Sequence, residues 1–302
     1  MHPLIQRLIE RGPVLTDGAW GTQLQARGLQ IGESPDGWNL LHPDRVADVA
    51  RAYVEAGSQI ILTNTFGTNR LRLAEQGLAG KTADLNRSGV EISRRAAAER
   101  ALVFGSIGPS GKLLLDGAIS AEELRAAFDE QAQALAEAGA DGLVIETMTD
   151  LEEAKLALAA AKSTRLPVVA CMVFDSGKDK DRTMMGHTPE EVACALSQAG
   201  ADAIGANCGH GIPGFASICR RLRAATDLPI WLKPNAGLPQ MVNGQPKYTL
   251  APDEFATSVS KLVELGANFI GGCCGTDPEF IRALHRRLRE KTAGLGAPAR
   301  TL

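Results

Sequence analysis

Three cysteines carry the clearest chemical signal in the sequence. Cys273 and Cys274 are adjacent within the glycine-rich segment Gly271–Thr276, and Cys208 stands 65 residues before Cys273 at the end of another apolar run. Successive strand residues face opposite ways, so adjacent cysteines bind one ion only from a distorted strand end, which flanking glycines permit. Three thiolates with an open fourth position are typical of a catalytic zinc site. The pattern therefore favours zinc held by Cys208, Cys273 and Cys274.

Ligation by sulfur alone also indicates the reaction. Three thiolates leave a zinc site with a charge of about −1, a poor Lewis acid for water but a good host for one more soft ligand. A free thiol with a pKa of about 8.5 is only a few per cent ionised at pH 7, and zinc would raise the reactive fraction by a factor on the order of 30. Alkyl transfer to a bound thiol follows naturally. Two alternatives are three buried core thiols and a redox disulfide between neighbouring cysteines. Cys171, Cys194 and Cys219 are assigned to the core.

The cysteines must be brought together by the fold, and a repeated phrase indicates how. An Ala/Leu/Glu-rich helix ends at a glycine and a short apolar strand follows, at Gly57, Gly139, Gly200 and Gly266. Glycine is favoured there because it adopts the left-handed cap conformation without steric cost. These glycines are 82, 61 and 66 residues apart, about twice a βαβ unit of roughly 30 residues. The marked strands are therefore every second strand.

The remaining strands fall between the marked ones, which gives eight short apolar strands of the kind buried on both faces. The four unmarked strands are predicted at 14–16, 102–105, 168–172 and 230–232. Helices are predicted at 121–138, 151–162, 189–199 and 253–265, and capping residues open three of them: Ser120, Asp150 and Thr188. We predict a single-domain (β/α)8 TIM barrel over residues 1–302, with an ordered core from about 10 to 290. An open doubly wound sheet is the alternative.

Composition excludes several classes of partner. The chain has 302 residues, of which 44% are hydrophobic and 22% charged, as in ordinary globular proteins. The net charge of −3 provides no basic field for nucleic acid or an anionic membrane. No apolar run approaches the roughly 18 to 20 residues that a membrane span requires. The N-terminus lacks a signal-peptide core, and the cysteines do not form a secreted disulfide pattern, so we expect a cytoplasmic protein.

The segments that end the predicted strands resemble the homocysteine S-methyltransferase family. The resemblance runs in order from about residue 10 to 290 and rests on 17–22, 63–66, 105–109, Glu146-Thr147, Asn207-Cys208 and 271–276. It implies a zinc-dependent enzyme that transfers a methyl group to the thiol of L-homocysteine and forms methionine. It also implies that Cys208, Cys273 and Cys274 are both the metal ligands and the catalytic residues.

Within the family, segments 61–68 and 234–239 are most similar to the homocysteine-binding module of cobalamin-dependent methionine synthase. By this resemblance Asn235 binds zinc through its amide oxygen when no thiol is present. The chain is expected to stop after the barrel, so methylcobalamin on a separate corrinoid protein is the expected methyl donor. Gly209-His210-Gly211 departs from the segment expected after the Asn-Cys pair, which puts the donor face in doubt.

Betaine or S-methylmethionine is the alternative donor. These donors are cations that an aromatic cage could hold at about 0.5 to 2 kcal/mol per ring. Aromatic residues make up only 4% of the chain, and Trp20 and Phe66 are the rings expected near the barrel mouth, with Trp38 and Tyr248 in less certain loops. This scarcity favours the corrinoid donor.

Homocysteine brings an ammonium and a carboxylate that need partners. Glu146 ends an apolar strand, where an unpaired carboxylate is costly, and the resemblance assigns it to the ammonium. The alternative is a salt bridge across the barrel. Asp17 and the backbone around Gly18, Ala19 and Thr22 are expected to orient the substrate, although Asp17 could instead cap its loop. Thr65 and Asn207 could bond the substrate or merely satisfy loop backbone.

Two further readings compete with methyl transfer. Lys233 ends an apolar strand, where a lysine with a lowered pKa could form a Schiff base in an aldolase-type barrel. Such a lysine more often pairs with a carboxylate, here Glu146 or Asp17. A zinc-binding subunit without activity is the other reading, but metal storage needs no amino-acid recognition by Glu146.

Overall fold

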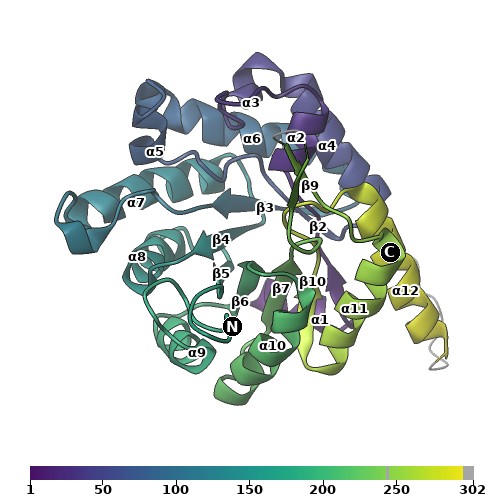
Figure 1. The fold of residues 1–302 in the computed structure, drawn as a ribbon. Helices are drawn as coiled ribbons and strands as arrows, with labels where there is room; N and C mark the ends of the chain where they lie inside the picture. The colour runs from purple at the N-terminus through teal and green to yellow at the C-terminus, as the bar shows by residue number, and fades with distance from the viewer. Residues whose placement is uncertain (243–244, 295–302) are drawn as a thin grey trace.

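The computed structural model describes residues 1–242 and 245–294 and forms a barrel of eight parallel strands. Their order in the sheet is β1-β10-β7-β6-β5-β4-β3-β2. Figure 1 shows the helices arranged in a ring outside the strands. The strands are β1 Val14–Leu15, β2 Ile60–Leu62, β3 Leu102–Ile107, β4 Gly142–Met148, β5 Val168–Met172, β6 Ala203–Cys208, β7 Ile230–Pro234 and β10 Ala267–Ile270. The predicted TIM barrel and all eight predicted strands are confirmed.

Helices follow the strands and pack on the outside of the barrel. The larger ones are α4 Pro43–Glu55, α6 Thr82–Ala97, α7 Ala121–Glu137, α8 Leu151–Lys162, α9 Pro189–Gln198, α10 Ile212–Ala225, α11 Pro252–Glu264 and α12 Pro278–Gly294. Ser120 and Thr188 open α7 and α9 with complete capping boxes, and the Asp150 side chain caps α8. The predicted caps and the four predicted helices are thus confirmed, with ends shifted by at most one residue.

The strands at the two ends of the sheet order, β1 and β2, are joined by one backbone hydrogen bond and by two side chains. Leu15 donates its N–H to the Gln59 side chain at 2.9 Å, and Gln59 donates its own N–H to the Leu15 carbonyl at 2.8 Å. Further up, Asp17 Oδ2 accepts from the Leu62 N–H at 2.8 Å. A carboxylate therefore takes a position that a strand carbonyl would otherwise fill, and it helps to close the barrel.

The core has two layers, one inside the barrel and one between barrel and helices. The inner layer holds Trp231, whose ring stacks on Phe269 with centroids 5.0 Å apart. Ile5 of the short helix α1 (Pro3–Ile9) is fully buried against this layer and plugs the amino end of the barrel. Since apolar side chains fill the lower part of the barrel, chemistry is confined to the carboxyl ends of the strands.

The sequence analysis missed an antiparallel hairpin in the segment after β7. Its strands are β8 Gln240–Val242 and β9 Gln245–Lys247. The strands are only three residues long and do not alternate apolar with polar residues, so periodicity could not reveal them. Short helical segments within other loops were also missed: α2 Gly21–Ala26, α3 Trp38–Leu41, α5 Arg70–Ala74, η1 Ala79–Lys81 and η2 Leu114–Asp116.

The helix α12 continues through Gly294, four residues beyond the expected end of the ordered core near 290. Among the residues that the structure describes, no helix combines the length and apolar character needed to cross a lipid bilayer.

Candidate metal and substrate site

Three cysteine sulfurs meet at the carboxyl end of the barrel. Cys208 is the last residue of β6, and Cys273 and Cys274 follow β10 after two glycines. The Cys208 sulfur lies 3.1 Å from the Cys273 sulfur and 3.8 Å from the Cys274 sulfur, and all three lie within 4.8 Å of one another. All three are free thiols. The arrangement can hold one soft metal ion and leave a ligand position for a substrate.

The backbone reaches this arrangement through unusual conformations. Cys208 has a φ of +59°, in the left-handed region that few residues other than glycine adopt, and Gly209 continues the turn at +72°. Beyond β10, Cys273 donates its N–H to the Pro234 carbonyl at 2.9 Å, and the Ala236 N–H donates to the Cys274 carbonyl at 2.9 Å. These bonds fix the strand ends of β7 and β10 against each other, so the sulfurs are held by backbone and not by side-chain packing alone.

The glycines beside the cysteines are required by close contacts. A Cβ at Gly271 would lie 2.1 Å from the Thr16 hydroxyl oxygen, and one at Gly272 would lie 2.4 Å from that of Thr276. A Cβ at Gly275 would lie 2.2 Å from the Tyr248 ring, and Gly275 also has a φ of +80°. The glycine-rich segment thus lets the adjacent cysteines approach Cys208, as the sequence analysis expected.

Asn235 directly follows β7 and is bonded to Gly209, the residue after Cys208. Its Nδ2 donates to the Gly209 carbonyl at 2.8 Å, whereas its Oδ1 is buried and has no hydrogen-bond partner among the described residues. A buried amide oxygen without a partner is costly unless something binds it. The three sulfurs and this oxygen therefore fit a metal ion, and they come from three strand ends.

Without a cation, the thiols share protons among themselves. Hydrogen bonds from Cys208 and Cys273 lower the pKa of Cys274, whereas the hydrogen bonds of Cys208 with Cys273 and then with Cys274 raise the pKa of Cys208. Three negative sulfurs this close would repel one another strongly, so full ionisation of the cluster requires a bound cation.

Glu146 lies in the upper part of β4, within the barrel. Its Oε1 accepts a hydrogen bond from the Ser106 hydroxyl at 2.6 Å. Burial raises the pKa of Glu146 to about 7, although the positive charge of Lys233 opposes that rise. Among the described residues it forms no ion pair within 4.0 Å, so the salt bridge across the barrel that we considered for it is not present. Its carboxylate is available to a cationic group.

Lys233 is paired with Asp17. The Nζ of Lys233 lies 2.5 Å from Asp17 Oδ1, while Asp17 Oδ2 accepts from the Trp20 indole N–H and the Leu62 N–H, both at 2.8 Å. Although burial lowers the pKa of Lys233, the charges of Asp17 and Glu146 outweigh it and leave that pKa raised. A Schiff base needs a neutral amine, so this geometry disfavours the aldolase reading. It matches the alternative that Lys233 pairs with a carboxylate.

The remaining predicted substrate residues lie in the loops around the cysteines, and most of their polar groups already have partners. The Ala19 N–H faces the Thr276 hydroxyl at 3.2 Å, and a Cβ at Gly18 would lie 2.8 Å from that hydroxyl. The Thr65 hydroxyl donates to the Ser106 carbonyl at 2.7 Å, so it satisfies backbone. The Thr22 hydroxyl is buried and has no hydrogen-bond partner among the described residues.

Asn207 also bonds within the protein, to both the amide and the hydroxyl of Thr147. Sequence reasoning had assigned no role to Thr147 or to Ser106, and it had weighed Tyr248 only as a possible cage ring. Burial raises the pKa of Tyr248 to about 12, and its hydroxyl is hydrogen-bonded to Cys274. The positions of Ser106 and Thr147 at strand ends were visible in the sequence, but their contacts were not.

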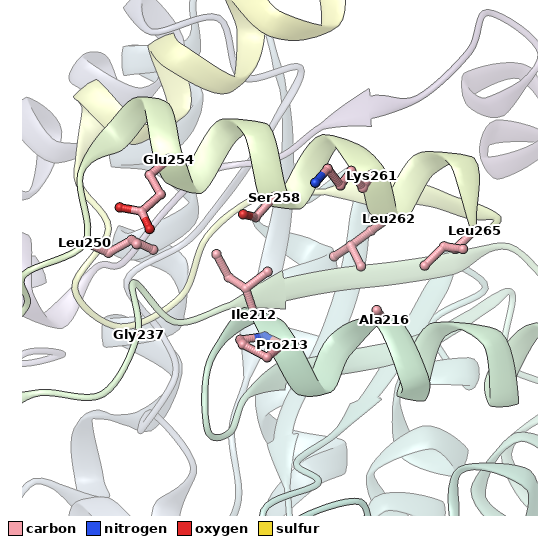
Figure 2. Close-up of a pocket in the computed structure, with 10 residues that line it drawn as sticks. All are labelled: Ile212, Pro213, Ala216, Gly237, Leu250, Glu254, Ser258, Lys261, Leu262 and Leu265. Atoms are coloured by element: carbon pink, nitrogen blue, oxygen red, sulfur yellow. The ribbon is translucent and has the colours of Figure 1, made fainter.

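A separate cavity of about 320 Å³ lies between α10 and α11, outside the barrel. Figure 2 shows its apolar side chains facing each other from the two helices. It is lined by Ile212, Pro213, Ala216, Gly237, Leu250, Glu254, Ser258, Lys261, Leu262 and Leu265. None of the three clustered cysteines and no carboxylate from inside the barrel lines it, so the cysteine site lies elsewhere.

Known proteins share both the sequence and the architecture. A family model described as homocysteine S-methyltransferase matches residues 14–288. Methionine synthase of Mycobacterium leprae is 32% identical over 295 residues, which cover 92% of this chain and 24% of the relative. Methionine synthase of Mycobacterium tuberculosis is 33% identical over 285 residues, with 88% and 24% covered. The chain thus spans about a quarter of the length of these relatives.

Solved structures are similar as well. The metallated form of the homocysteine methyltransferase MmuM from Escherichia coli superposes with a TM-score of 0.79 at 28% identity, covering 95% of this chain and all of that one. Its oxidised form gives a TM-score of 0.78 at the same identity and coverage.

Proposed function

The chain belongs to the homocysteine S-methyltransferase family, and from this premise we propose that it methylates the thiol of L-homocysteine in a zinc-dependent reaction that yields methionine. The observation that carries the proposal is the meeting of three free sulfurs at one end of the barrel. It is supported by Asn235, which bonds the residue after Cys208 and whose buried Oδ1 has no partner among the described residues. Glu146, a half-buried carboxylate that forms no ion pair among the described residues, adds the means to recognise an amino acid.

In this proposal Cys208, Cys273 and Cys274 would hold zinc, and Asn235 Oδ1 would complete the site when no thiol is bound. When bound, zinc lowers the pKa of a substrate thiol while keeping it nucleophilic. Glu146 binds the homocysteine ammonium and is itself held by Ser106 at 2.6 Å. We assign the homocysteine carboxylate to the Thr22 hydroxyl, which has no other hydrogen-bond partner among the described residues. Homocysteine sulfur then forms a bond to the methyl carbon as the bond from that carbon to its donor breaks.

We propose a methylated corrinoid, such as methylcobalamin, carried by a partner protein or module, as the methyl donor. The two mycobacterial relatives bear the name methionine synthase. The aromatic rings also argue against a cage for a small cationic donor. Trp38 is buried beneath Arg45, Trp231 is buried at the bottom of the barrel, and Phe66 faces the Arg72 guanidinium at 5.9 Å. Trp20 donates its indole N–H to Asp17, and of these rings only Tyr248 lies against the cysteine segment.

A small methyl donor such as betaine or S-methylmethionine is the second candidate. This chain covers the whole of the homocysteine methyltransferase MmuM, so one barrel of this size is sufficient for that enzyme. Assays with free methylcobalamin, betaine and S-methylmethionine, each with homocysteine, distinguish the donors by the rate of methionine formation. Turnover with methylcobalamin alone supports the corrinoid donor, and turnover with a small cation alone contradicts it.

The acceptor half is tested independently of the donor. We expect one zinc per chain and a metal-edge X-ray absorption spectrum that fits three sulfur neighbours and one lighter atom, changing to four sulfurs when homocysteine is added. No zinc, or three sulfurs that homocysteine leaves unchanged, would contradict the proposed substrate. We propose that the enzyme acts in the cytoplasm, where reducing conditions keep thiols of this kind available for zinc.

A further inference from the structure

Thr147, which follows Glu146 in β4, is held in a conformation that threonine rarely adopts. Its φ is +62°, in the left-handed region, where a β-branched side chain is a genuine outlier. The pairing of β4 with β5 changes register between Ile145 and Met148, so the strand bulges at Glu146 and Thr147. Bulges of this kind re-aim side chains beside active sites. The bulge therefore determines the direction of the Glu146 carboxylate.

Asn207 of β6 holds this bulge from two strands away. Its Oδ1 accepts the Thr147 N–H at 2.7 Å, and its Nδ2 donates to the Thr147 hydroxyl at 2.7 Å. Nδ2 also faces the Cys273 sulfur at 3.7 Å. Both amide hydrogens and one acceptor position are thus used inside the protein, and the side chain is 1% exposed. Little of Asn207 is left to bind a substrate.

The chain on either side of these contacts carries the proposed chemistry. Asn207 directly precedes Cys208, which is also left-handed with a φ of +59°, and Thr147 directly follows Glu146. The neutral amide of Asn207 therefore joins the end of β4, which carries Glu146, to the ends of β6 and β10, which carry the cysteines. A carboxylate in its place would have no hydrogen for the Thr147 hydroxyl and would bring a negative charge towards the Cys273 sulfur.

We propose that Asn207 is a positioning residue for homocysteine recognition: through Thr147 it holds Glu146 at the distance from the cysteine cluster that the amino acid requires. This inference rests on the proposed function, because it takes Glu146 as the partner of the ammonium. It changes the expected role of Asn207 from substrate contact to positioning. Strained conformations persist where surrounding contacts determine them, and Asn207 supplies those contacts to Thr147.

The test compares Asn207→Ala with the double variant Asn207→Ala/Thr147→Gly. Loss of the Asn207 amide should raise the KM for homocysteine about tenfold or more, because a misplaced Glu146 carboxylate loses a charged hydrogen bond to the substrate. The value of kcat should change much less. Glycine adopts a positive φ freely. The double variant should therefore recover a substantial part of the lost KM, which is a rescue that a role in general stability would not produce.

Asn86→Ala is the matched control, because Asn86 is buried and bonds the carbonyls of Thr68 and Thr82 away from the cysteines. It should lower stability without raising the KM. An unchanged KM in Asn207→Ala, a KM rise equal to that of Asn86→Ala, or no rescue by Thr147→Gly would each overturn the proposal.

The coupling between Asn207 and Thr147 is also measured by urea unfolding of the metal-free protein in a double-mutant cycle. This measurement needs no substrate, so it separates two kinds of failure. Strong coupling in a protein whose wild type does not bind homocysteine would contradict the proposed function and the role in recognition. Absence of coupling in a protein that does methylate homocysteine would contradict the positioning role alone.

Discussion

Lys233 and Asp17 form an ion pair inside the barrel, with Nζ 2.5 Å from Oδ1 and the two side chains only 2% and 0% exposed. The pair spans from β7 to the segment after β1, across β10. The second carboxylate oxygen of Asp17 bonds the Leu62 N–H, where β1 and β2 are not joined by a ladder of their own. One aspartate therefore neutralises a buried lysine and closes the barrel beneath the cysteines.

Replacing one partner of this pair should destabilise the protein strongly. Lys233→Met leaves the Asp17 carboxylate buried and uncompensated, and breaking a buried pair in this way costs about 3 to 5 kcal/mol. Urea unfolding of the metal-free protein measures the loss. The double variant Asp17→Asn/Lys233→Met removes both charges and should unfold at a higher urea concentration than Lys233→Met. If the single variant is as stable as the wild type, the pair does not have the role assigned to it.

Glu146 should make homocysteine binding depend on pH near neutrality. Burial raises its pKa from 4.5 to about 7, so in the empty site the carboxylate is charged above this value and neutral below it. Only the charged form attracts an ammonium. The KM for homocysteine should therefore rise as the pH falls below about 7, approaching tenfold per pH unit.

The control for that prediction is Glu146→Gln, whose KM for homocysteine should be high and should not rise further as the pH falls below about 7. Because the homocysteine thiol titrates in the same way with both proteins, its effect cancels when the wild type is compared with the variant. The same shift affects stability. Between pH 4.5 and about 7 the folded protein binds a proton at Glu146 that the unfolded chain has released. This contribution to stability is fully present below pH 4.5 and is lost as the pH rises through about 7. A wild-type KM that is flat from pH 5.5 to 8 would contradict the role of Glu146.

Gly275→Ala should disturb the cysteine site more than backbone strain alone explains. The new Cβ would lie 2.2 Å from the Tyr248 ring, and the φ of +80° adds about 1 to 2 kcal/mol for a residue other than glycine. Because the Tyr248 hydroxyl bonds Cys274, displacement of the ring should weaken metal binding as well as stability. Chelator competition measures the zinc affinity.

Gly77→Ala provides the matched control for Gly275→Ala. Gly77 has a φ of +69° and nothing within 4 Å of an added Cβ, so this variant carries the strain without the collision. We expect a comparable strain cost and unchanged zinc affinity. Equal zinc affinity in the two variants would show that contact with Tyr248 is not needed at the site.

The sequence predicted the elements of the fold well because each strand is apolar on both faces and each helix ends in a recognisable signal. Glycine caps marked four strands, and side-chain caps such as Ser120 marked helix starts. The same regularity identified the strand ends where Cys208 and Glu146 lie. These are local properties that a few neighbouring residues determine.

The contacts within the site could not be predicted in this way. The pairing of Lys233 with Asp17 instead of Glu146 depends on the side-chain positions of three strands. The left-handed conformation of Thr147 opposes its own preference and exists because Asn207, sixty residues later, binds it. The β8–β9 hairpin was missed because its strands are too short to show a period. What escaped prediction is therefore determined by tertiary contacts.

Cys273→Ser should remove zinc and activity together. A serine hydroxyl stays protonated at neutral pH and is a poor partner for zinc, so one of three ligand bonds is lost. We expect zinc content below about a tenth of that of the wild type and a loss of methionine formation of about thirtyfold or more, since only a few per cent of a free thiol is ionised at neutral pH. Cys194→Ser is the control, because Cys194 lies outside the cysteine cluster and is exposed on α9, so its predicted place in the core was wrong, unlike those of the buried Cys171 and Cys219. It should keep both zinc and activity. A Cys273→Ser protein that is fully active without metal would mean that homocysteine is activated in some other way, and the assignment of the three sulfurs would be wrong.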